Sequence, residues 1–475
     1  MYRILFVGLF LLLFTAPYPA VVMGQPVSVK TSGAGPGGPK YVVGLGEYQC
    51  FVLVSATGKL YGISDNMTLL GVGDNSGIPG LPVAVNVPDS VVFRDVASGL
   101  HNSLAVDQSG GVWTWGANNS GESGTGQTGD NYITRPVKIG TDSVGAPFSH
   151  VVQVACWANN YSNGNLAVKS DGTVWIWGNT AGGMRGNGQA GQVNTRPVKV
   201  DIPRRIKKVV ACEVVIALAE DGSVWTWGGN NRHELLGVNT GDYMRPHRVI
   251  LPQGAKDIAG GGFFSYALGV NGTLYGWGYY SSYMGIGNGG YQVSNFAVPV
   301  PRDLTADLKL PARIASVTTN SVSTHVILTD GTLWGWGDNA CGAVGDGAEL
   351  DYARHNPPYL WDWGPGQLLV QRPAHIAKDI RSFTHVFGGS GAVFYSYAET
   401  SSGQLYSWGR NKTGVLGNGV IGATSEIVAK YPNSWDVPLV TAVDPFSLHV
   451  NKVLTSPYCL LHPDESPCNQ YRAGR

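Results

Sequence analysis

The sequence predicts an all-β protein: a seven-bladed β-propeller of four-stranded antiparallel blades, closed by terminal strands. Three observations support this prediction: a short aromatic motif occurs seven times, a proline-led segment follows each copy, and the composition favours strands and turns. Glycine accounts for 67 of the 475 residues, and charged residues make up 13% of the chain. Such a composition suits many short strands joined by tight turns.

The repeated motif is a glycine followed by an aromatic strand, as in GGVWTWG at 110–116. Further copies lie at 172–178, 222–228, 272–278, 331–337 and 403–409, and a weaker copy, GKLYGIS, lies at 58–64. Repeats of this size indicate a propeller or a solenoid. The glycine supplies the positive φ of a hairpin turn, and apolar groups on both faces are typical of a strand between stacked sheets.

The aromatic residues of the motif are assigned to the architecture, because ten of the fourteen tryptophans lie in these copies. The second tryptophan of each strong copy is predicted to hold one blade against the next. These residues are Trp115, Trp177, Trp227, Trp277, Trp336 and Trp408.

Two short apolar runs precede each motif, as in FRDVASG and NSLAV at 93–99 and 102–106. A proline-led segment follows it, with prolines at Pro82, Pro136, Pro197, Pro246, Pro299, Pro373 and Pro438. Since proline cannot donate a ladder hydrogen bond, this segment is predicted to be the outer edge strand. Four strands with the proline strand outermost make one propeller blade.

This succession of Val-Ala-Cys/Gly, Leu-Ala-Leu/Val, Asp-Gly-x-Val-Trp-x-Trp-Gly and a glycine-rich loop resembles the regulator of chromosome condensation repeat family, over about residues 40–460. The resemblance implies a seven-bladed propeller, and it implies guanine-nucleotide exchange as one function. The chain departs from the family pattern in its first repeat, where Tyr61 and Ile63 replace the tryptophans. The histidine usual before the Leu-Ala strand is mostly absent.

Both ends of the chain contain segments that are similar to blade strands. Residues 26–30 resemble an outer proline strand, and residues 449–461 resemble an inner pair. One blade is therefore expected to take strands from both termini, because closure protects sheet edges. A reduced eighth blade made from these segments is the alternative.

Residues 1–24 predict a signal peptide, with Arg3 before the apolar run 4–14 and small residues Val22 and Gly24 before the cleavage site. A membrane anchor is the alternative, but the run is short for a span of roughly 20 residues. We therefore expect a secreted protein that starts near Gln25. The predicted divisions are a signal peptide (1–24), an N-terminal segment (25–39), the propeller (40–461) and a tail (462–475).

An exported chain can form disulfides and carry glycans. Cys459 and Cys468 are the easiest pair to bridge, whereas Cys156 and Cys212 are interpreted as small buried apolar residues. Five sequons are candidates for glycosylation: Asn66, Asn118, Asn160, Asn271 and Asn411.

The longest departure from the repeat is an aromatic loop that contains Tyr352, Tyr359, Trp361 and Trp363 beside two adjacent prolines. Aromatic-rich loops on rigid scaffolds often make binding hot spots, so these four residues are the predicted partner-binding site. The alternative is a lid that covers apolar propeller surface.

Several function classes are disfavoured by the composition and the motifs. The formal net charge is zero and the isoelectric point is about 7.1, so no nucleic-acid partner is expected. No catalytic constellation, metal-ligand spacing or cofactor motif is found. Asp74, Asp346 and Asn418 recur in the glycine-rich loops, where a bond to the backbone is favoured over a calcium site.

We therefore predict a secreted, monomeric, non-catalytic scaffold that binds a protein partner, with no membrane contact once the signal peptide is cleaved. A guanine-nucleotide exchange factor and an extracellular enzyme inhibitor are the alternatives. A glycan-cleaving propeller is disfavoured, because it would need paired carboxylates at the central channel.

Overall fold

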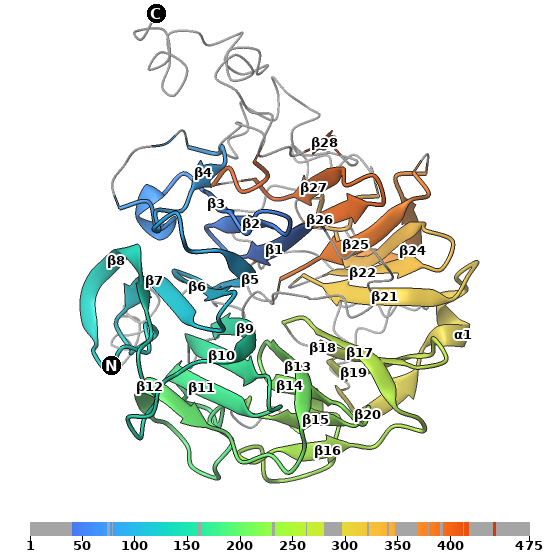
Figure 1. The fold of residues 1–475 in the computed structure, drawn as a ribbon. Coiled ribbons are helices and arrows are strands. Elements are labelled where there is room, and N and C mark those ends of the chain that lie inside the picture. The colour runs from blue at the N-terminus through green and yellow to red at the C-terminus, as the bar shows by residue number, and fades with distance from the viewer. Residues whose placement is uncertain are drawn as a thin grey trace, which may run out of the picture.

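Twenty-eight strands form seven four-stranded sheets arranged as blades around a ring (Figure 1). This computed structural model describes residues 40–442 except 74–76, 78, 159–162, 230–232, 263, 280–296, 321–322, 340–341, 347–368, 379, 390–392, 412 and 418–439. Within that part of the chain, helix is limited to α1 (Thr305–Leu308), η1 (Met67–Leu69) and η2 (His233–Leu236). None of these helices is long and apolar enough to cross a membrane.

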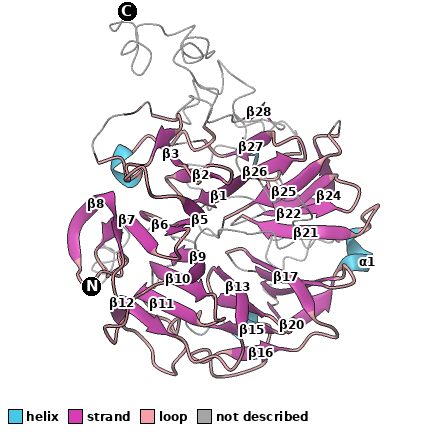
Figure 2. Cartoon of the chain, viewed as in Figure 1, coloured by secondary structure: helices cyan, strands magenta, loops and turns pink. Residues whose placement is uncertain are grey.

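Each blade follows the same order from the centre of the ring to its rim (Figures 1 and 2). The innermost strands are β1 (Tyr41–Leu45), β5 (Phe93–Ser98), β9 (Val151–Ala158), β13 (Ile206–Ala211), β17 (Ala255–Gly260), β21 (Ile314–Thr319) and β25 (Phe383–Phe387). The second strands are β2 (Cys50–Val54), β6 (Asn102–Asp107), β10 (Asn163–Lys169), β14 (Val215–Ala219), β18 (Phe264–Gly269), β22 (Ser323–Leu328) and β26 (Tyr395–Thr400). The third strands are β3 (Leu60–Ile63), β7 (Val112–Asn118), β11 (Val174–Asn179), β15 (Val224–Trp227), β19 (Leu274–Tyr279), β23 (Leu333–Asp338) and β27 (Leu405–Gly409). The outer strands are β4 (Val83–Ala84), β8 (Gly129–Lys138), β12 (Val193–Lys199), β16 (His247–Val249), β20 (Ala297–Asp303), β24 (Leu369–Ile376) and β28 (Val440–Ala442).

The predicted fold class is confirmed: the chain forms seven blades of four antiparallel strands in a ring. The aromatic motif forms the third strand, and Pro136, Pro197 and Pro373 lie in the outer strands. Proline is tolerated there because the outer strand pairs on one side only.

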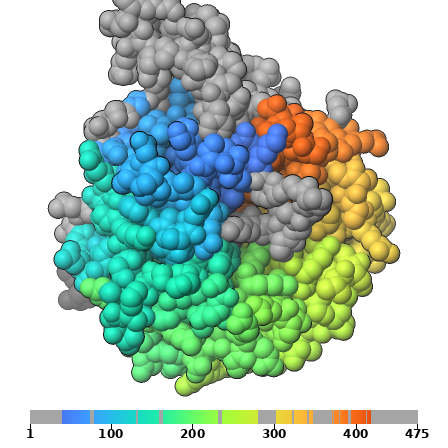
Figure 3. Space-filling view, viewed as in Figure 1, coloured from blue at the N-terminus to red at the C-terminus, as the bar shows by residue number. Residues whose placement is uncertain are grey.

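The ring closes between blade 7 (β25–β28) and blade 1 (β1–β4), whose surfaces lie next to each other in Figure 3. Val43 and Leu45 of β1 pack in one core with Tyr397 of β26. The Tyr395 hydroxyl donates to the carbonyl of Gly46 at 2.7 Å. Among the described residues, every blade takes its four strands from one continuous stretch, so the prediction that one blade combines strands from both termini is wrong for these seven sheets. Residues 26–30 and 449–461, which were predicted to supply those strands, lie outside the described residues.

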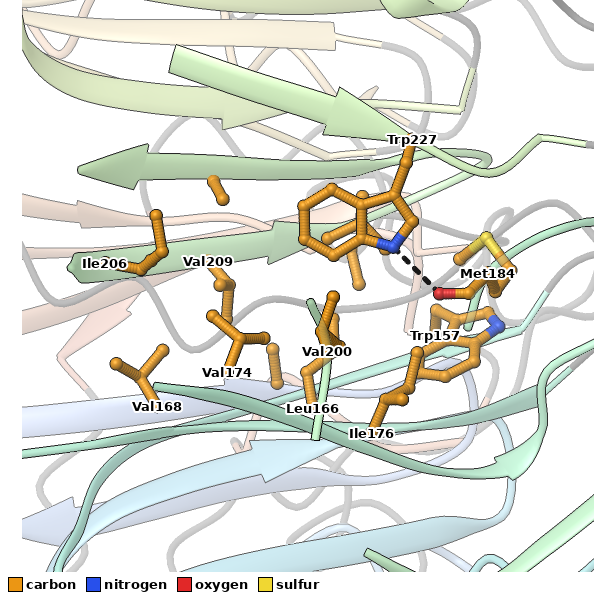
Figure 4. Packing of buried hydrophobic residues seen from close by; sticks show 14 of the residues in the cluster. Trp157, Leu166, Val168, Val174, Ile176, Met184, Val200, Ile206, Val209 and Trp227 are labelled. Atoms are coloured by element: carbon orange, nitrogen blue, oxygen red, sulfur yellow. Dashed lines mark hydrogen bonds between the residues drawn. The ribbon is translucent and has the colours of Figure 1, made fainter. Parts of the chain in front are cut away.

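Neighbouring blades are joined by the second tryptophan of the motif. Its indole N–H donates to a carbonyl in the loop that follows the third strand of the preceding blade, as Trp227 does to Met184 at 2.8 Å (Figure 4). Equivalent bonds run from Trp115 to Leu69, Trp177 to Glu122, Trp277 to Leu235 and Trp408 to Ala343, at 2.9–3.2 Å. Trp336 is buried too, but its Nε1 has no partner among the described residues, and the corresponding loop falls in 280–296.

The glycines of these loops are needed because each lies against the indole of the next blade. Gly124 has φ +67°, and a Cβ there would come 2.8 Å from Nε1 of Trp177. Gly345 stands in the same relation to Trp408. These loops also contact the next outer strand, where Gly126 N–H donates to the carbonyl of Thr195 at 2.8 Å. The glycine-rich loop and the proline segment, which are separate motifs in the sequence, are therefore one joint between blades.

Core packing follows a rule of compensation between the second and third strands. Where the second strand carries a large side chain, such as Tyr266 or His325, the residue opposite it is Gly276 or Gly335. A Cβ on either glycine would lie 3.0 Å from the opposing ring. Blades with Leu or Ile in the second strand carry Thr or Ile opposite, as Leu104 opposes Thr114. A large residue thus faces a glycine, and a medium-sized residue faces another medium-sized one, as close packing favours.

A polar residue at the bulge of the inner strand bonds to the backbone of the following blade. Asp95 accepts from Val154 N–H at 3.0 Å, and the side chain of Gln153 bonds both N–H and C=O of Val209 at 2.9 Å. In the next blade the Lys208 ammonium donates to Asp257 and to the carbonyl of Ile258. These buried groups are satisfied by the neighbouring blade, so they fix how adjacent blades sit together.

Candidate functional site

The antiparallel order gives the ring two different ends. We call "the loop face" the end that carries the connections between first and second strands and between third and fourth strands. The opposite end, "the hairpin face", carries the short turns such as 270–272 and the connections between blades. Both ends of the predicted binding loop lie on the loop face, because Asp338 pairs with Leu369 where β23 ends and β24 begins.

Three rings from blades 1 and 2 meet on the loop face. Tyr48, from the loop between β1 and β2, stacks on His101 with centroids 5.0 Å apart. Tyr132 of β8 meets the edge of His101 at 6.4 Å and is 42% exposed. Aromatic residues with an apolar face and a polar tip are enriched in protein interfaces.

A cation–π pair from blade 7 extends this surface. The Arg410 guanidinium lies 5.7 Å from the ring centroid of Phe394. Burial and the neighbouring Glu47 raise the pKa of Tyr48, and the positive charge of Arg410 acts in the opposite direction. Blade 7 contacts the loop that carries Tyr48 through Tyr395, whose hydroxyl donates to the carbonyl of Gly46 at 2.7 Å. Tyr48, His101, Tyr132, Phe394 and Arg410 together are called "the loop-face arc".

The backbone beneath the loop-face arc is held in place. The carbonyl of His101 accepts from Ala117 N–H at 2.8 Å, and the Gln49 amide donates to the carbonyl of Gly99 at 2.9 Å. Burial lowers the pKa of His101, and its Nδ1 has no hydrogen-bond partner among the described residues. The arc therefore offers a preformed surface, which reduces the entropy lost on binding.

His325 is a core residue, in contrast to His101. It is fully buried, packs edge-on against Trp408, and its Nε2 lies 3.1 Å from the carbonyl of Val344. Burial lowers its pKa to about 4, so the ring is neutral at pH 7 and Nε2–H donates. His101 instead lies half-buried on the loop face.

In three blades the glycine-rich loop is held by an asparagine side chain. Asn118, Asn339 and Asn411 follow the Trp-Gly of their blades, and each Oδ1 accepts from the backbone N–H five residues later at 2.9–3.0 Å. Asp346 accepts from Asn339 Nδ2 at 2.9 Å. No group of three or more potential metal ligands occurs within the described part of the chain, which excludes Asp74 and Asn418.

The sequons fall into two groups. Asn66 and Asn271 are exposed. Asn118 and Asn411 are 6% and 4% exposed, and Asn118 Nδ2, the atom that would carry a glycan, donates to the carbonyl of Gln127 at 3.0 Å. Among the four described sequons, accessibility in the folded state favours Asn66 and Asn271 over Asn118 and Asn411. Asn160 lies outside the described residues.

Other predicted residues also fall outside the described part of the chain. They are Tyr352, Tyr359, Trp361 and Trp363 of the predicted binding loop and the pair Cys459 and Cys468. Cys156 and Cys212 are buried free thiols, as is Cys50. The loop-face arc was missed by sequence reasoning, because its members are single residues from three repeats. The sequence contained one signal for this site. His101 precedes the Leu-Ala strand of its repeat, and most of the other repeats have no histidine at that position.

Comparison with known proteins supports the repeat type. Residues 109–158 and 93–122 match two descriptions of the regulator of chromosome condensation (RCC1) repeat. Residues 93–158 carry the RCC1 repeat. They contain blade 2 and the first strand of blade 3, so the motif, its loop and the outer proline strand are all included.

Similar proteins cover most of the propeller at modest identity. The ultraviolet-B receptor UVR8 of Arabidopsis thaliana is 27% identical over 357 residues, which are 74% of this chain and 72% of UVR8. Human HERC6, a probable E3 ubiquitin-protein ligase, is 28% identical over 307 residues, 62% of this chain but 24% of HERC6. The chain thus spans a small part of that larger protein.

Solved structures share the fold. Human WBSCR16 superposes with a TM-score of 0.56 at 20% identity, covering 78% of this chain and 98% of that one. Prp20p of Saccharomyces cerevisiae, described with its binding to Gsp1p and histones, gives 0.57 at 23% identity, covering 75% and 82%. At these identities the likeness concerns the fold alone.

Proposed function

We propose that this chain is an exported, non-catalytic interaction propeller that binds a protein partner through its loop face. The observation that supports the proposal best is the loop-face arc, where aromatic rings and a cation from blades 7, 1 and 2 meet on one held surface. Aromatic and arginine side chains supply most of the energy of protein interfaces. Prp20p, described with its binding to Gsp1p and histones, gives a precedent for protein binding by this fold.

Three of the buried charges have partners in a neighbouring blade. Asp95, Lys208 and Asp257 bond to the adjacent blade and are at most 5% exposed, so they are poorly placed to meet a substrate. This supports a scaffold over an enzyme that works at the central channel.

The binding test compares capture by three versions of the mature chain. The wild-type protein is used for affinity capture from culture medium, and bound proteins are identified by mass spectrometry. A Tyr48→Ser, His101→Ser, Tyr132→Ser variant should lose the captured partner. A Val144→Ser, Val270→Ser variant is the matched control, because these residues are 85% and 64% exposed on the hairpin face. Equal capture by the two variants, with unchanged melting temperatures, would place the partner elsewhere.

The predicted aromatic loop is tested in the same assay. A Tyr359→Ala, Trp361→Ala, Trp363→Ala variant should lose capture without a change in melting temperature if these residues bind the partner. A large drop in melting temperature would show that they cover the propeller instead.

Export needs its own test, since it separates this function from guanine-nucleotide exchange on an intracellular partner. N-terminal sequencing of secreted protein should begin near Gln25. Recovery of a cytosolic protein that retains Met1 would contradict export and favour the exchange function.

A further inference from the structure

A groove lies on the rim of the ring, between blade 4 and blade 5. Its volume is about 620 Å³, within the range of small-ligand and peptide sites. The walls are formed by the loop 237–240, by His247, Arg248 and Ile250 at and after β16, and by Pro301 of β20. It is separate from the loop-face arc, which belongs to blades 7, 1 and 2.

The outer strand of blade 4 explains why the groove is there. β16 pairs with β15 over three residues only, from Val224–Val249 to Thr226–His247. In blade 3, by contrast, β12 pairs along β11 as far as Asn179–Val193. In blade 4 the helix η2 and the loop 237–240 occupy the chain before β16, so this edge is bordered by a loop and not by a long strand.

The chemistry of the groove is a cation beside apolar groups. Arg248 is exposed, and its guanidinium has no hydrogen-bond or ion-pair partner among the described residues. Its neighbour Arg245 is already bound to Asp242 at 3.0 Å. Ile250 is 73% exposed, and Val238, which also lines the groove, is half-buried against the core of blade 4.

Arg248 is unpaired because the blade supplies no acid to it. The corresponding residue of blade 2 is Lys138, which binds Asp107 at 2.7 Å. The position of Asp107 is taken by Ala219 in blade 4, since both pair with the first residue of the inner strand. The aromatic face of Trp225 is already approached by Arg204, at 5.9 Å.

We propose that this groove binds an extended peptide in which an acidic and an apolar side chain lie two residues apart, as Arg248 and Ile250 do, because alternate side chains of a strand share one face. The acid would meet Arg248, and the apolar residue would cover Ile250 and Val238. β16 is the outermost strand of its sheet, so its outward backbone groups are free to pair with the peptide as an added strand. The positive charge of Arg248 favours an acidic residue in the peptide. The free edge of β16 favours an extended peptide backbone.

The test begins with a phage library of random heptapeptides selected on the full mature chain. We expect enrichment of sequences with Asp or Glu two positions away from Val, Ile or Leu. One enriched peptide is then labelled and measured by fluorescence anisotropy. Arg248→Gln should weaken its binding about tenfold, since a charge-assisted hydrogen bond is lost, and Ile250→Ser should weaken it several-fold.

Matched controls separate this site from others. Arg205→Gln removes an exposed blade 4 cation that binds Glu220 and does not line the groove, so it should leave affinity unchanged. The Tyr48→Ser, His101→Ser, Tyr132→Ser variant should also bind the peptide with unchanged affinity, whether or not it loses the protein partner captured by the loop face. N-methylation of alternate peptide backbone nitrogens should abolish binding.

Several results would overturn the proposal. They are selection of no acidic–apolar sequence, equal affinity for the Gln analogue of the peptide, equal binding by Arg248→Gln, or full competition by millimolar inorganic phosphate. The last would show a site for a bare anion and not for a peptide. Both variants change exposed residues, so their melting temperatures should match that of the wild type.

Discussion

Blade 2 and blade 4 have similar interiors, but they differ at their outer strands. Trp177 of blade 3 donates to the loop of blade 2, and Trp277 of blade 5 donates to the loop of blade 4 in the same way. Their outer strands differ, because β8 has ten residues and β16 has three. The interior is constrained by a neighbour on each side, whereas the outer strand pairs on one side and can vary.

The cations of the two outer strands show the same contrast. Lys138 binds Asp107, which also accepts from Trp113 Nε1 at 2.9 Å. Burial alone would raise the pKa of Asp107, but hydrogen bonds from Lys138, Ser109 and Trp113 together hold that pKa below its usual range. Arg248 of blade 4 has no such partner in the described residues. These two blades therefore keep the same joining bonds, whereas the length and the ion pairing of their outer strands differ.

The largest expected effect is loss of an interior tryptophan. Trp177→Ala or Trp227→Ala should lower the free energy of unfolding by about 3–5 kcal/mol, because a buried indole and its hydrogen bond are removed. Urea denaturation measures this change. Trp361→Ala, in the predicted binding loop, should cost far less. Equal losses for all three would end the division between structural and binding aromatics.

The second effect depends on pH and on His325. Since burial lowers its folded pKa to about 4 and the unfolded value is near 6.5, the unfolded state binds the proton first as pH falls. The free energy of unfolding should therefore decrease between pH 6.5 and 4, by up to about 3 kcal/mol. His325→Leu, which copies the leucine of blade 2, should remove this decrease.

Urea titrations at several pH values compare His325→Leu with His101→Gln, a half-buried loop-face histidine. The second variant should keep most of the wild-type slope. An unchanged slope in His325→Leu would show that another group controls stability in this pH window.

The third effect tests the glycine joint. Gly124→Ala should cost about 1–3 kcal/mol, because the positive φ is strained and the new Cβ meets Trp177. Gly145→Ala isolates the backbone cost, since Gly145 has φ +85° and nothing within 4 Å of a built Cβ. If the two variants unfold at the same urea concentration, the indole contact contributes nothing.

The smallest effect separates the two outer-strand cations. Lys138→Gln should lower the free energy of unfolding by at most about 1 kcal/mol, because Lys138 is partly exposed and its pair with Asp107 is screened. Arg248→Gln should change it by nearly zero. A measurable loss in Arg248→Gln would reveal an intramolecular partner and weaken the case for a binding groove.

The sequence alone determined the fold class, because each blade repeats the same local chemistry. Glycine at the turn, tryptophan in a doubly buried strand and proline at the edge each have a local physical reason, and seven copies made the pattern unmistakable. It did not reveal that the glycine loop of one blade bonds the tryptophan and outer strand of the next. Nor did the sequence reveal that Gly335 is needed to accommodate His325, because the pairing of these two residues depends on the strand register.

Only the tertiary structure decided which exposed residues come together. Tyr48, His101 and Arg410 are separated by up to 362 residues, and closing the ring brings blade 7 against blade 1. Arg248 looks like any other cation of an Arg-Pro segment until the absence of an acid at Ala219 is seen. A repeat records local strand chemistry, whereas surfaces arise from long-range closure and from unrepeated residues, for which periodicity contains no signal.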